Sequence, residues 1–380
     1  MEETPGIALY IHIPFCLAKC AYCDFISYDD RAGLYGEYTS ALVTEMDRAE
    51  PGSIQSIYIG GGTPTVLPLL HIERIFEAIQ RRFAPGIGTE ITIEANPGTV
   101  SPAKLEGLRA LGVTRLSLGV QSFVEEELRL LGRIHSAPEA IEALRAGREA
   151  GFDNLSLDLI YGLPRQSLSS WRASLQQAIA FQPEHLSLYA LSVEEGTSLA
   201  ADIARGRLPA PDPDLAADMY ELAQETLSAA GFVHYEISNW ARSPEFACRH
   251  NLTYWHNEPY LGIGAGAHSW RHGRRWSNLT RPEEYIRCMR DGLAPTVDEE
   301  TIGPELEMGE TMMLGLRLLG EGVTFVRFQA RFGLDLRVQY AGALEELAEL
   351  GLLQTTAERV VLSRRGRLLG NRVFLRFLRD

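Results

Sequence analysis

Short runs of β-branched and apolar residues alternate with amphipathic stretches over the first half of the chain. The apolar runs predict strands that begin at Ile7, Ile54, Thr89, Thr114, Asn154 and His185. The stretches between them place apolar residues at i, i+3 and i+4, which is the spacing of one helix face, over residues 35–48, 69–83, 103–111, 138–150 and 171–181. Ser101 and Pro102 are typical of a helix start. The pattern therefore predicts an α/β fold of alternating strands and helices.

Repeated strand–helix–strand units require right-handed crossovers and a parallel sheet with its helices outside. Six units predict a partial (β/α)6 barrel, and an open doubly wound sheet is the alternative. In both architectures, functional side chains gather where the strands end.

The alternation fades after about Leu191, where residues 213–230 predict one further helix. From Thr301 onward, helical stretches are followed by a strand-like pair over residues 360–378. This order predicts a C-terminal helical, winged-helix-like domain. We expect a core barrel over residues 1–240, a connecting segment packed on it over 241–300, and the C-terminal domain over 301–380.

Charge narrows the range of partners. The 380 residues include 50 acidic and 36 basic side chains, a formal charge of −14, which repels a phosphate backbone. We therefore expect no nucleic-acid partner, and a structural or lid role for the winged unit. No apolar run approaches the ~18 residues that cross a bilayer, and the first residues lack a signal-peptide pattern. The expected location is the cytoplasm.

Three of the five cysteines lie within eight positions. Cys16, Cys20 and Cys23 form C-x3-C-x2-C directly after the first predicted strand, and such a cluster in a reducing compartment indicates a metal site. Structural zinc and 4Fe-4S clusters usually take four protein ligands, but no fourth cysteine is near. Two interpretations remain: a zinc site completed by His12, or a cluster with one iron open to a ligand.

Polar residues and glycines follow the predicted strands. Gly60 to Gly62 allow a ligand to approach the backbone, or form a tight turn. Glu94, Gln121 and Asp158 lie at or near strand ends, where a carboxylate in an apolar barrel needs a partner. Arg133 can hold a carboxylate with two hydrogen bonds. Taken singly, each of these residues also fits an ordinary buried hydrogen bond or ion pair.

The segment YIHIPFCLAKCAYCDF resembles the cluster signature of the radical S-adenosylmethionine (SAM) superfamily. The resemblance implies a 4Fe-4S cluster on Cys16, Cys20 and Cys23, with SAM on the open iron and its cleavage to a 5′-deoxyadenosyl radical. It also implies roles for the strand-end residues: Gly61, Gly62, Thr63 and Glu94 around the methionine amino group, Arg133 at its carboxylate, Asp158 at the ribose, Gln121 in the wall, Tyr10 and Tyr22 beside cluster and adenine, and Ala190 through its backbone.

Within this superfamily, the motifs resemble the group that contains oxygen-independent coproporphyrinogen III oxidases and heme chaperones. The oxidases carry a further cysteine two positions after the third ligand and have a longer N-terminal arm. Here Phe25 occupies that position and fifteen residues precede Cys16, which disfavours the oxidase.

The segment HNLTYW matches the HNxxYW motif of the chaperone branch. This match implies heme contact through His250, Asn251, Tyr254 and Trp255, since imidazole ligates heme iron and aromatic rings pack on a porphyrin. A local hydrogen-bonded turn is the alternative. Two further residues stay open: Cys248 is either a rival ligand or an inert buried thiol, and His268 can face the same cavity.

The sequence thus predicts a heme chaperone that binds a 4Fe-4S cluster, SAM and heme, and passes heme to hemoproteins. Membrane-bound hemoproteins are included as transient partners, and both a monomer and a homodimer fit. The oxygen-independent coproporphyrinogen III oxidase is the first alternative, so the sequence leaves open whether the chain is an enzyme. A zinc-stabilised binding module is the second.

Overall fold

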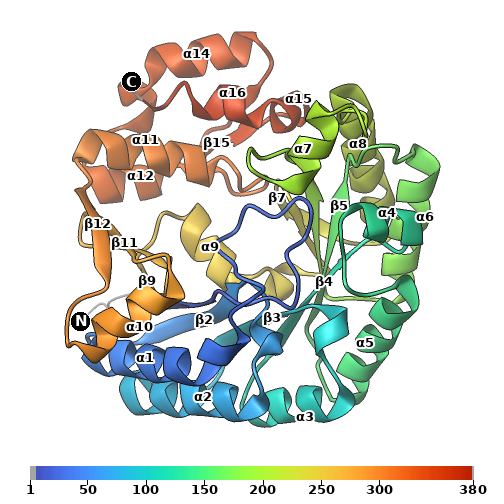
Figure 1. Cartoon of the computed structure of the whole chain (residues 1–380). Coiled ribbons are helices and arrows are strands. Elements are labelled where there is room, and N and C mark those ends of the chain that lie inside the picture. The colour runs from blue at the N-terminus through green and yellow to red at the C-terminus, as the bar shows by residue number, and fades with distance from the viewer. Residues whose placement is uncertain (1–5, 379–380) are drawn as a thin grey trace.

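The computed structural model describes residues 6–378. Six strands pair in parallel and in chain order, each with its sequence neighbour (Figure 1). They are β1 (Ile7–Ile13), β2 (Ile54–Gly61), β3 (Glu90–Ala95), β4 (Arg115–Gln121), β5 (Leu155–Tyr161) and β6 (His185–Ala190). These strands curve into the predicted partial (β/α)6 barrel.

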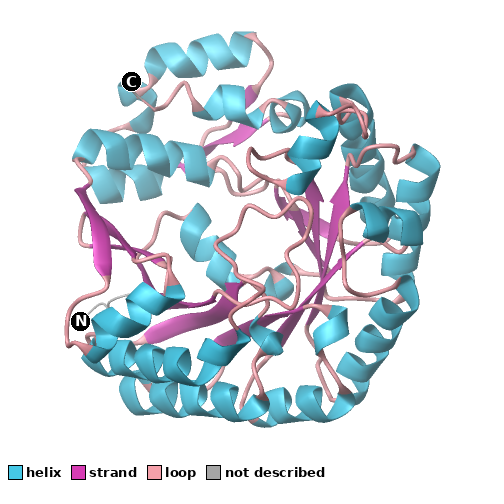
Figure 2. Ribbon diagram, in the orientation of Figure 1, coloured by secondary structure: helices cyan, strands magenta, loops and turns pink. Residues whose placement is uncertain are grey.

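Helices cover the outside of the curved sheet (Figure 2). They are α1 (Tyr35–Arg48), α2 (Leu69–Phe83), α3 (Pro102–Ala110), α4 (Glu125–Leu130), α5 (Ala137–Glu149), α6 (Leu168–Ala180) and α8 (Pro213–Ala229). Helix α7 (Ser198–Ala204) instead contacts the loop after β1, where the Leu199 amide donates to the Ala21 carbonyl. The Ser101 side chain accepts a hydrogen bond from the amide of Lys104 and Pro102 begins α3, as predicted. The pattern did not predict α4, because its six residues are too few to show a helical period.

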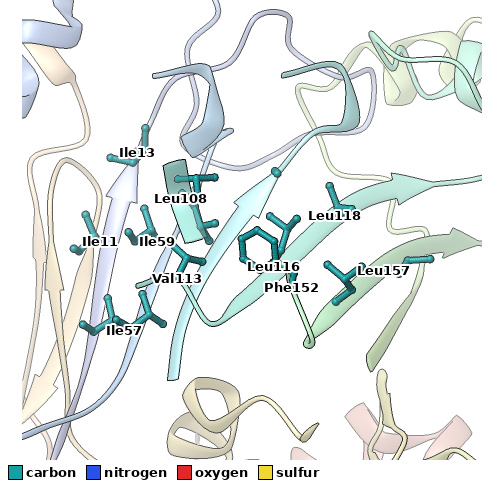
Figure 3. Close-up of a cluster of buried hydrophobic side chains, with 14 of the residues drawn as sticks. Ile11, Ile13, Ile57, Ile59, Leu108, Val113, Leu116, Leu118, Phe152 and Leu157 are labelled. Carbon is teal, nitrogen blue, oxygen red and sulfur yellow. The ribbon is translucent and has the colours of Figure 1, made fainter. Parts of the chain in front are cut away.

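Strand side chains fill the space between sheet and helices. Ile11, Ile57, Leu116 and Leu157 have no exposed surface, and Figure 3 shows their side chains in one buried cluster. Along each strand, apolar residues alternate with polar ones such as Ser117, Asp158 and Ser187, which line a cavity on the inner side of the sheet. The burial of the apolar residues explains why the six strands are visible in the sequence.

Further strands extend the sheet at both edges. β7 (Val233–Glu236) and β8 (Asn239–Ala241) follow β6, while β9 (Tyr260–Ile263), β10 (His268–Arg271), β11 (Arg274–Asn278) and β12 (Thr296–Thr301) follow β1. Two helices belong to this segment, α9 (Arg249–Trp255) and α10 (Pro282–Arg290). The sequence did not predict these strands, which are short and partly polar; every residue of β12 is exposed. None of the helices within residues 6–378 combines the length and apolar character needed to span a bilayer.

The C-terminal residues form a separate core above the barrel (Figure 1). Their elements are α11 (Pro304–Gly315), β13 (Val323–Thr324), α12 (Phe325–Phe332), α13 (Leu336–Gln339), α14 (Ala341–Glu349), β14 (Leu353–Thr355), β15 (Arg359–Leu362), α15 (Arg364–Leu368) and α16 (Gly370–Phe374). The strand order β13-β15-β14 beside these helices is winged-helix-like, as predicted.

One prediction in this region is wrong. Residues 360–378 form β15 and then two helices, rather than a pair of strands. The Ser363 side chain caps α15 by accepting from the amide of Gly366, and Leu369, Val373 and Phe377 recur at the four-residue spacing of a helix face. The partner of β15 in the hairpin is β14, which precedes it.

Candidate functional site

The three clustered cysteines lie in the loop between β1 and α1, seen over the centre of the barrel in Figure 1. The amide of Cys16 donates to the Tyr28 carbonyl (3.0 Å), which closes the loop, and that of Cys23 donates to the Cys20 carbonyl (3.2 Å). All three side chains line one cavity of about 450 Å³, which we call the cysteine cavity. The C-x3-C-x2-C spacing therefore places three thiols on a common space.

His12 does not join these thiols. Its Nδ1 lies 2.9 Å from the Tyr10 hydroxyl and its Nε2 lies 2.9 Å from the Ile26 carbonyl. Burial lowers its pKa to about 4. Within residues 6–378, no three His, Cys, Asp or Glu side chains are close enough to hold one metal ion, the three thiols included. The geometry offers no support for a zinc site completed by His12.

Two carboxylates line the same cavity, Glu94 and Asp158. Glu94 accepts hydrogen bonds from the Tyr58 hydroxyl (2.7 Å) and the Gly61 amide (3.3 Å), and Asp158 accepts from Ser117 (3.2 Å). Burial raises the pKa of Glu94 to about 7 and raises that of Asp158. Neither carboxylate forms an ion pair in the described part of the chain. A cationic ligand in the cavity would stabilise both ionised forms.

Arg133 and Gln121 bring incompletely bonded polar atoms to this cavity. Arg133 donates to the Gly119 carbonyl (2.7 Å), and its Nη1 lies 3.3 Å from the Cys20 sulfur. The Nε of Arg133 and the Oε1 of Gln121 are buried without a hydrogen-bond partner. Both residues line the cysteine cavity, so a polar ligand there is one way to supply the partners that these atoms lack. An anionic group of a ligand would supply the hydrogen-bond acceptor that the Nε of Arg133 lacks.

The glycine segment at the end of β2, Gly60 to Gly62, packs against the strand that leads to Cys16. The amide of Gly62 donates to the Ile13 carbonyl (2.8 Å) and that of Thr63 to the Phe15 carbonyl (2.7 Å). A Cβ on Gly62 would lie 2.6 Å from the Phe15 oxygen, and Gly61 has a φ of 113°. Glycine is therefore required at both positions. Thr63 also places its hydroxyl 3.7 Å from the Cys16 sulfur.

The remaining residues predicted to contact SAM line two different cavities. Tyr22 and Ala190 line the cysteine cavity, but Tyr10 does not. Tyr10 lines a neighbouring space of about 460 Å³ with Phe25, Tyr254, Tyr260 and His268, which we call the aromatic cavity. The sequence predicts Tyr10 beside the cluster, because it lies six residues before Cys16. In the structure, strand β1 directs the Tyr10 side chain into the aromatic cavity instead.

Known proteins match the chain along its length. Residues 10–178 match the radical SAM superfamily and residues 304–369 match the HemN C-terminal domain. Heme chaperone HemW of Bacillus subtilis is 39% identical over 97% of this chain and 98% of its own length. HemW of Lactococcus lactis is 36% identical over 100% of this chain and 99% of its own. The chain belongs to the HemW family.

The architecture of this HemW-family chain is also that of a solved radical SAM enzyme. Coproporphyrinogen III oxidase (HemN) from Escherichia coli superposes with a TM-score of 0.85 over 98% of this chain and 90% of that chain, at 24% identity. At this identity the likeness concerns the fold alone. It agrees with the barrel and the C-terminal unit described above.

The HNLTYW segment of the HemW-family chain forms helix α9. His250 is 1% exposed, its Nδ1 lies 3.0 Å from the Ser56 hydroxyl, and its Nε2 lies 2.9 Å from the Tyr254 hydroxyl. Burial lowers its pKa to about 3. Both ring nitrogens are occupied, so in this conformation the imidazole is not available to a heme iron.

The other predicted heme residues lie in three different places. Asn251 lines the cysteine cavity and Tyr254 lines the aromatic cavity. Trp255 packs under the guanidinium of Arg317 at 4.2 Å. Cys248 is fully buried near Glu90, and burial raises the pKa of its thiol to about 12, as for an inert thiol.

Sequence reasoning missed several side chains of the cysteine cavity. They are Tyr58, Arg115, Ser117 and Ser187. Ser117 is the register partner of Glu94 on β4, and Ser187 is that of Asp158 on β6. Register between parallel strands was the missing information, because the sequence gives strand positions without their alignment. The hydrogen bonds cross this register, since Ser117 donates to Asp158 while Glu94 accepts from Tyr58 and Gly61.

Proposed function

We propose that this protein holds a 4Fe-4S cluster on Cys16, Cys20 and Cys23, binds SAM beside it, and binds heme for transfer to hemoproteins. One observation carries the first two parts. Three thiols, two carboxylates without an ion pair, and a buried guanidinium with an unpartnered Nε line the same cavity. This donor set fits a thiolate-bound cluster together with a zwitterionic, cationic ligand.

Each side chain has a distinct proposed task. Glu94 would accept from the amino group of SAM, Asp158 from its ribose, and Arg133 would bind its carboxylate. Arg133 would also stabilise the negative charge of the Cys20 thiolate, which its guanidinium already contacts. When bound, the cluster supplies one-electron chemistry at the sulfonium of SAM. The chain's own residues orient the ligand and exclude water.

The heme part of the proposal is supported by the full-length similarity to proteins named heme chaperones. We propose hemoproteins, membrane-bound ones included, as the recipients. The three unpaired thiols need a reducing compartment, so we propose the cytoplasm as the location. A monomer and a homodimer both remain compatible with this role.

Phe25 argues against the oxidase alternative. Its side chain is 69% exposed and lines both cavities, at the position where the oxidases have a further cysteine. We therefore expect no conversion of coproporphyrinogen III by the reconstituted protein under anaerobic conditions with SAM and a reductant. Turnover to protoporphyrinogen IX would replace the chaperone proposal with the oxidase.

The test is anaerobic reconstitution of wild type, Cys20→Ala and Cys288→Ala with iron and sulfide. Cys288 is a free cysteine outside the cysteine cavity, so it serves as the control. Wild type and Cys288→Ala should carry four irons and the broad brown absorbance, and Cys20→Ala should lose both. Heme-loaded wild type should then pass heme to a heme-free hemoprotein. Colourless protein that contains zinc, or heme that stays bound, would overturn the proposal.

A further inference from the structure

The aromatic cavity has no task in the function proposed so far. It adjoins the cysteine cavity, and the two share the residues Asp24, Phe25, Gly61 and Glu94. Its walls include the rings of Tyr10, Tyr254 and Tyr260, together with exposed Phe25. Tyr254 and Tyr260 meet edge to face, with ring centroids 4.7 Å apart. A space of about 460 Å³ with aromatic walls suits a flat apolar ligand.

Two histidines, His12 and His268, line this cavity, and a third, His250, bonds to Tyr254 in its wall. Both nitrogens of His12 are occupied, as are both nitrogens of His250. His268 lines the cavity from the start of β10 and is exposed. In the described residues its ring makes no hydrogen bond. Of the three, only His268 presents an imidazole that a ligand can reach.

The chain holds His268 close to the cysteine loop. Gly266, two residues earlier, has a φ of 74°, and a Cβ there would lie 2.7 Å from the Ile26 side chain. Ile26 belongs to the loop that follows Cys23, and its carbonyl contacts His12. The turn that presents His268 is therefore packed directly against the segment that carries the thiols.

We propose that heme binds in the aromatic cavity with His268 as an axial ligand to its iron, and that His250 instead positions the cavity wall. Imidazole is the commonest protein ligand to heme iron, and the tyrosine rings would pack on the macrocycle. His250 contributes by holding the Tyr254 hydroxyl at 2.9 Å. This inference rests on the proposed heme binding and identifies its site.

The placement puts heme beside the proposed SAM site. Glu94 and Phe25 form part of the wall that the two cavities share. Phe25 is also the residue that replaces the oxidase cysteine, so this difference lies at the boundary between the two ligands. A heme in the aromatic cavity would cover the exposed face of the Phe25 ring.

The experiment compares His268→Asn with His272→Asn in the anaerobically reconstituted full chain. His272 is exposed at the turn of the same hairpin and lines neither cavity, and asparagine tolerates its φ of 55°. Hemin is titrated while the Soret band, the spin state and the iron–sulfur content are recorded. His268→Asn should bind hemin about tenfold or more weakly, with a shifted Soret band that added imidazole restores. His272→Asn should match wild type.

The outcomes separate this inference from the proposed function. If wild type and His268→Asn bind hemin equally, with the same Soret band, and His250→Gln loses binding, the inference is overturned while heme binding stands. If wild type binds no hemin although its cluster is intact, the heme part of the proposed function is overturned as well. Equal cluster content in the two asparagine variants shows that neither substitution acts through the cysteine loop.

Discussion

Single side chains in the cysteine cavity combine burial with an incomplete set of partners. Glu94 and Asp158 have raised pKa values because burial disfavours their charge, while Arg133 keeps a buried Nε without an acceptor. The sequence predicted all three residues, because each stands at or near the end of a predicted strand or in the loop after one. It did not predict that His250, chosen by its motif, would have both nitrogens occupied.

Glu94 should make SAM binding depend on pH. A cationic ligand favours the ionised carboxylate, whose pKa is about 7 in the free protein, so affinity should fall as pH drops from 8 to 6. Glu94→Gln should bind SAM about 10 to 100 times more weakly than wild type at pH 8, since a hydrogen bond to a charged group is worth about 1.5–3 kcal/mol. Its SAM affinity should also depend less on pH than that of wild type. Isothermal titration at both pH values measures this. Glu106→Gln, at an exposed position of α3, is the control, and SAM affinity unchanged in Glu94→Gln would contradict the assignment.

His250 should link stability to acid. Its pKa is about 3 in the folded chain against an ordinary value of 6.5. Between pH 3 and pH 6.5, His250 is therefore protonated in the unfolded chain but neutral in the folded chain. The free energy of unfolding should therefore fall as pH decreases from 6.5, by about 2 kcal/mol at pH 5 from this group. Urea denaturation at pH 7 and pH 5 should show a smaller fall for His250→Gln than for wild type. Identical falls would contradict this account.

Some helices and strands can be predicted from the sequence pattern and others cannot. The pattern predicts buried strands and long amphipathic helices. Helices α1 and α2 begin and end at the predicted residues. The strands β9 to β12 are not predicted, because each has six residues or fewer, and every residue of the edge strand β12 is exposed. In the C-terminal unit, apolar residues four apart near Val373 were taken for a strand although they form a helix face. Periodicity over so few residues does not separate the two.

The contact between the glycine segment and the cysteine loop should tolerate no side chain. In Gly62→Ala the new methyl group would displace the Phe15 backbone, and overpacking of this kind costs about 1–3 kcal/mol. Since Cys16 follows Phe15, we expect less iron and sulfide per chain after reconstitution, together with a lower denaturation midpoint. Gly86→Ala, in an exposed loop with no atom within 4 Å of its new Cβ, should match wild type. Full cluster loading of Gly62→Ala would show that the contact does not position Cys16.

The C-terminal unit joins the barrel through a buried ion pair. Glu236 of β7 has no exposed side-chain surface and pairs with Arg317 at 3.1 Å. Beside this pair, the amide of Leu319 donates to the Tyr235 carbonyl (3.0 Å). The same arginine covers Trp255. Sequence patterns predicted both parts of the molecule but not this junction, because its partners lie 81 positions apart.

Removal of the arginine should destabilise the whole chain. In Arg317→Met the buried Glu236 carboxylate loses its cation, which costs about 3 kcal/mol, the low end for buried pairs because Arg317 is 23% exposed. Chemical denaturation followed by far-ultraviolet circular dichroism measures the change. Arg376→Met breaks the surface pair with Glu346, with both side chains about half exposed, and should have little effect. Equal effects of the two substitutions would exclude the junction as a source of stability.

The central claim is that one cavity holds a three-thiolate cluster whose open iron binds SAM. Electron paramagnetic resonance of the reduced, reconstituted protein, recorded with and without SAM, tests it most directly. The account predicts a 4Fe-4S signal that shifts when SAM is added to wild type, and that is absent from Cys20→Ala. A wild-type signal that SAM leaves unchanged, or no iron–sulfur signal in wild type, would contradict it.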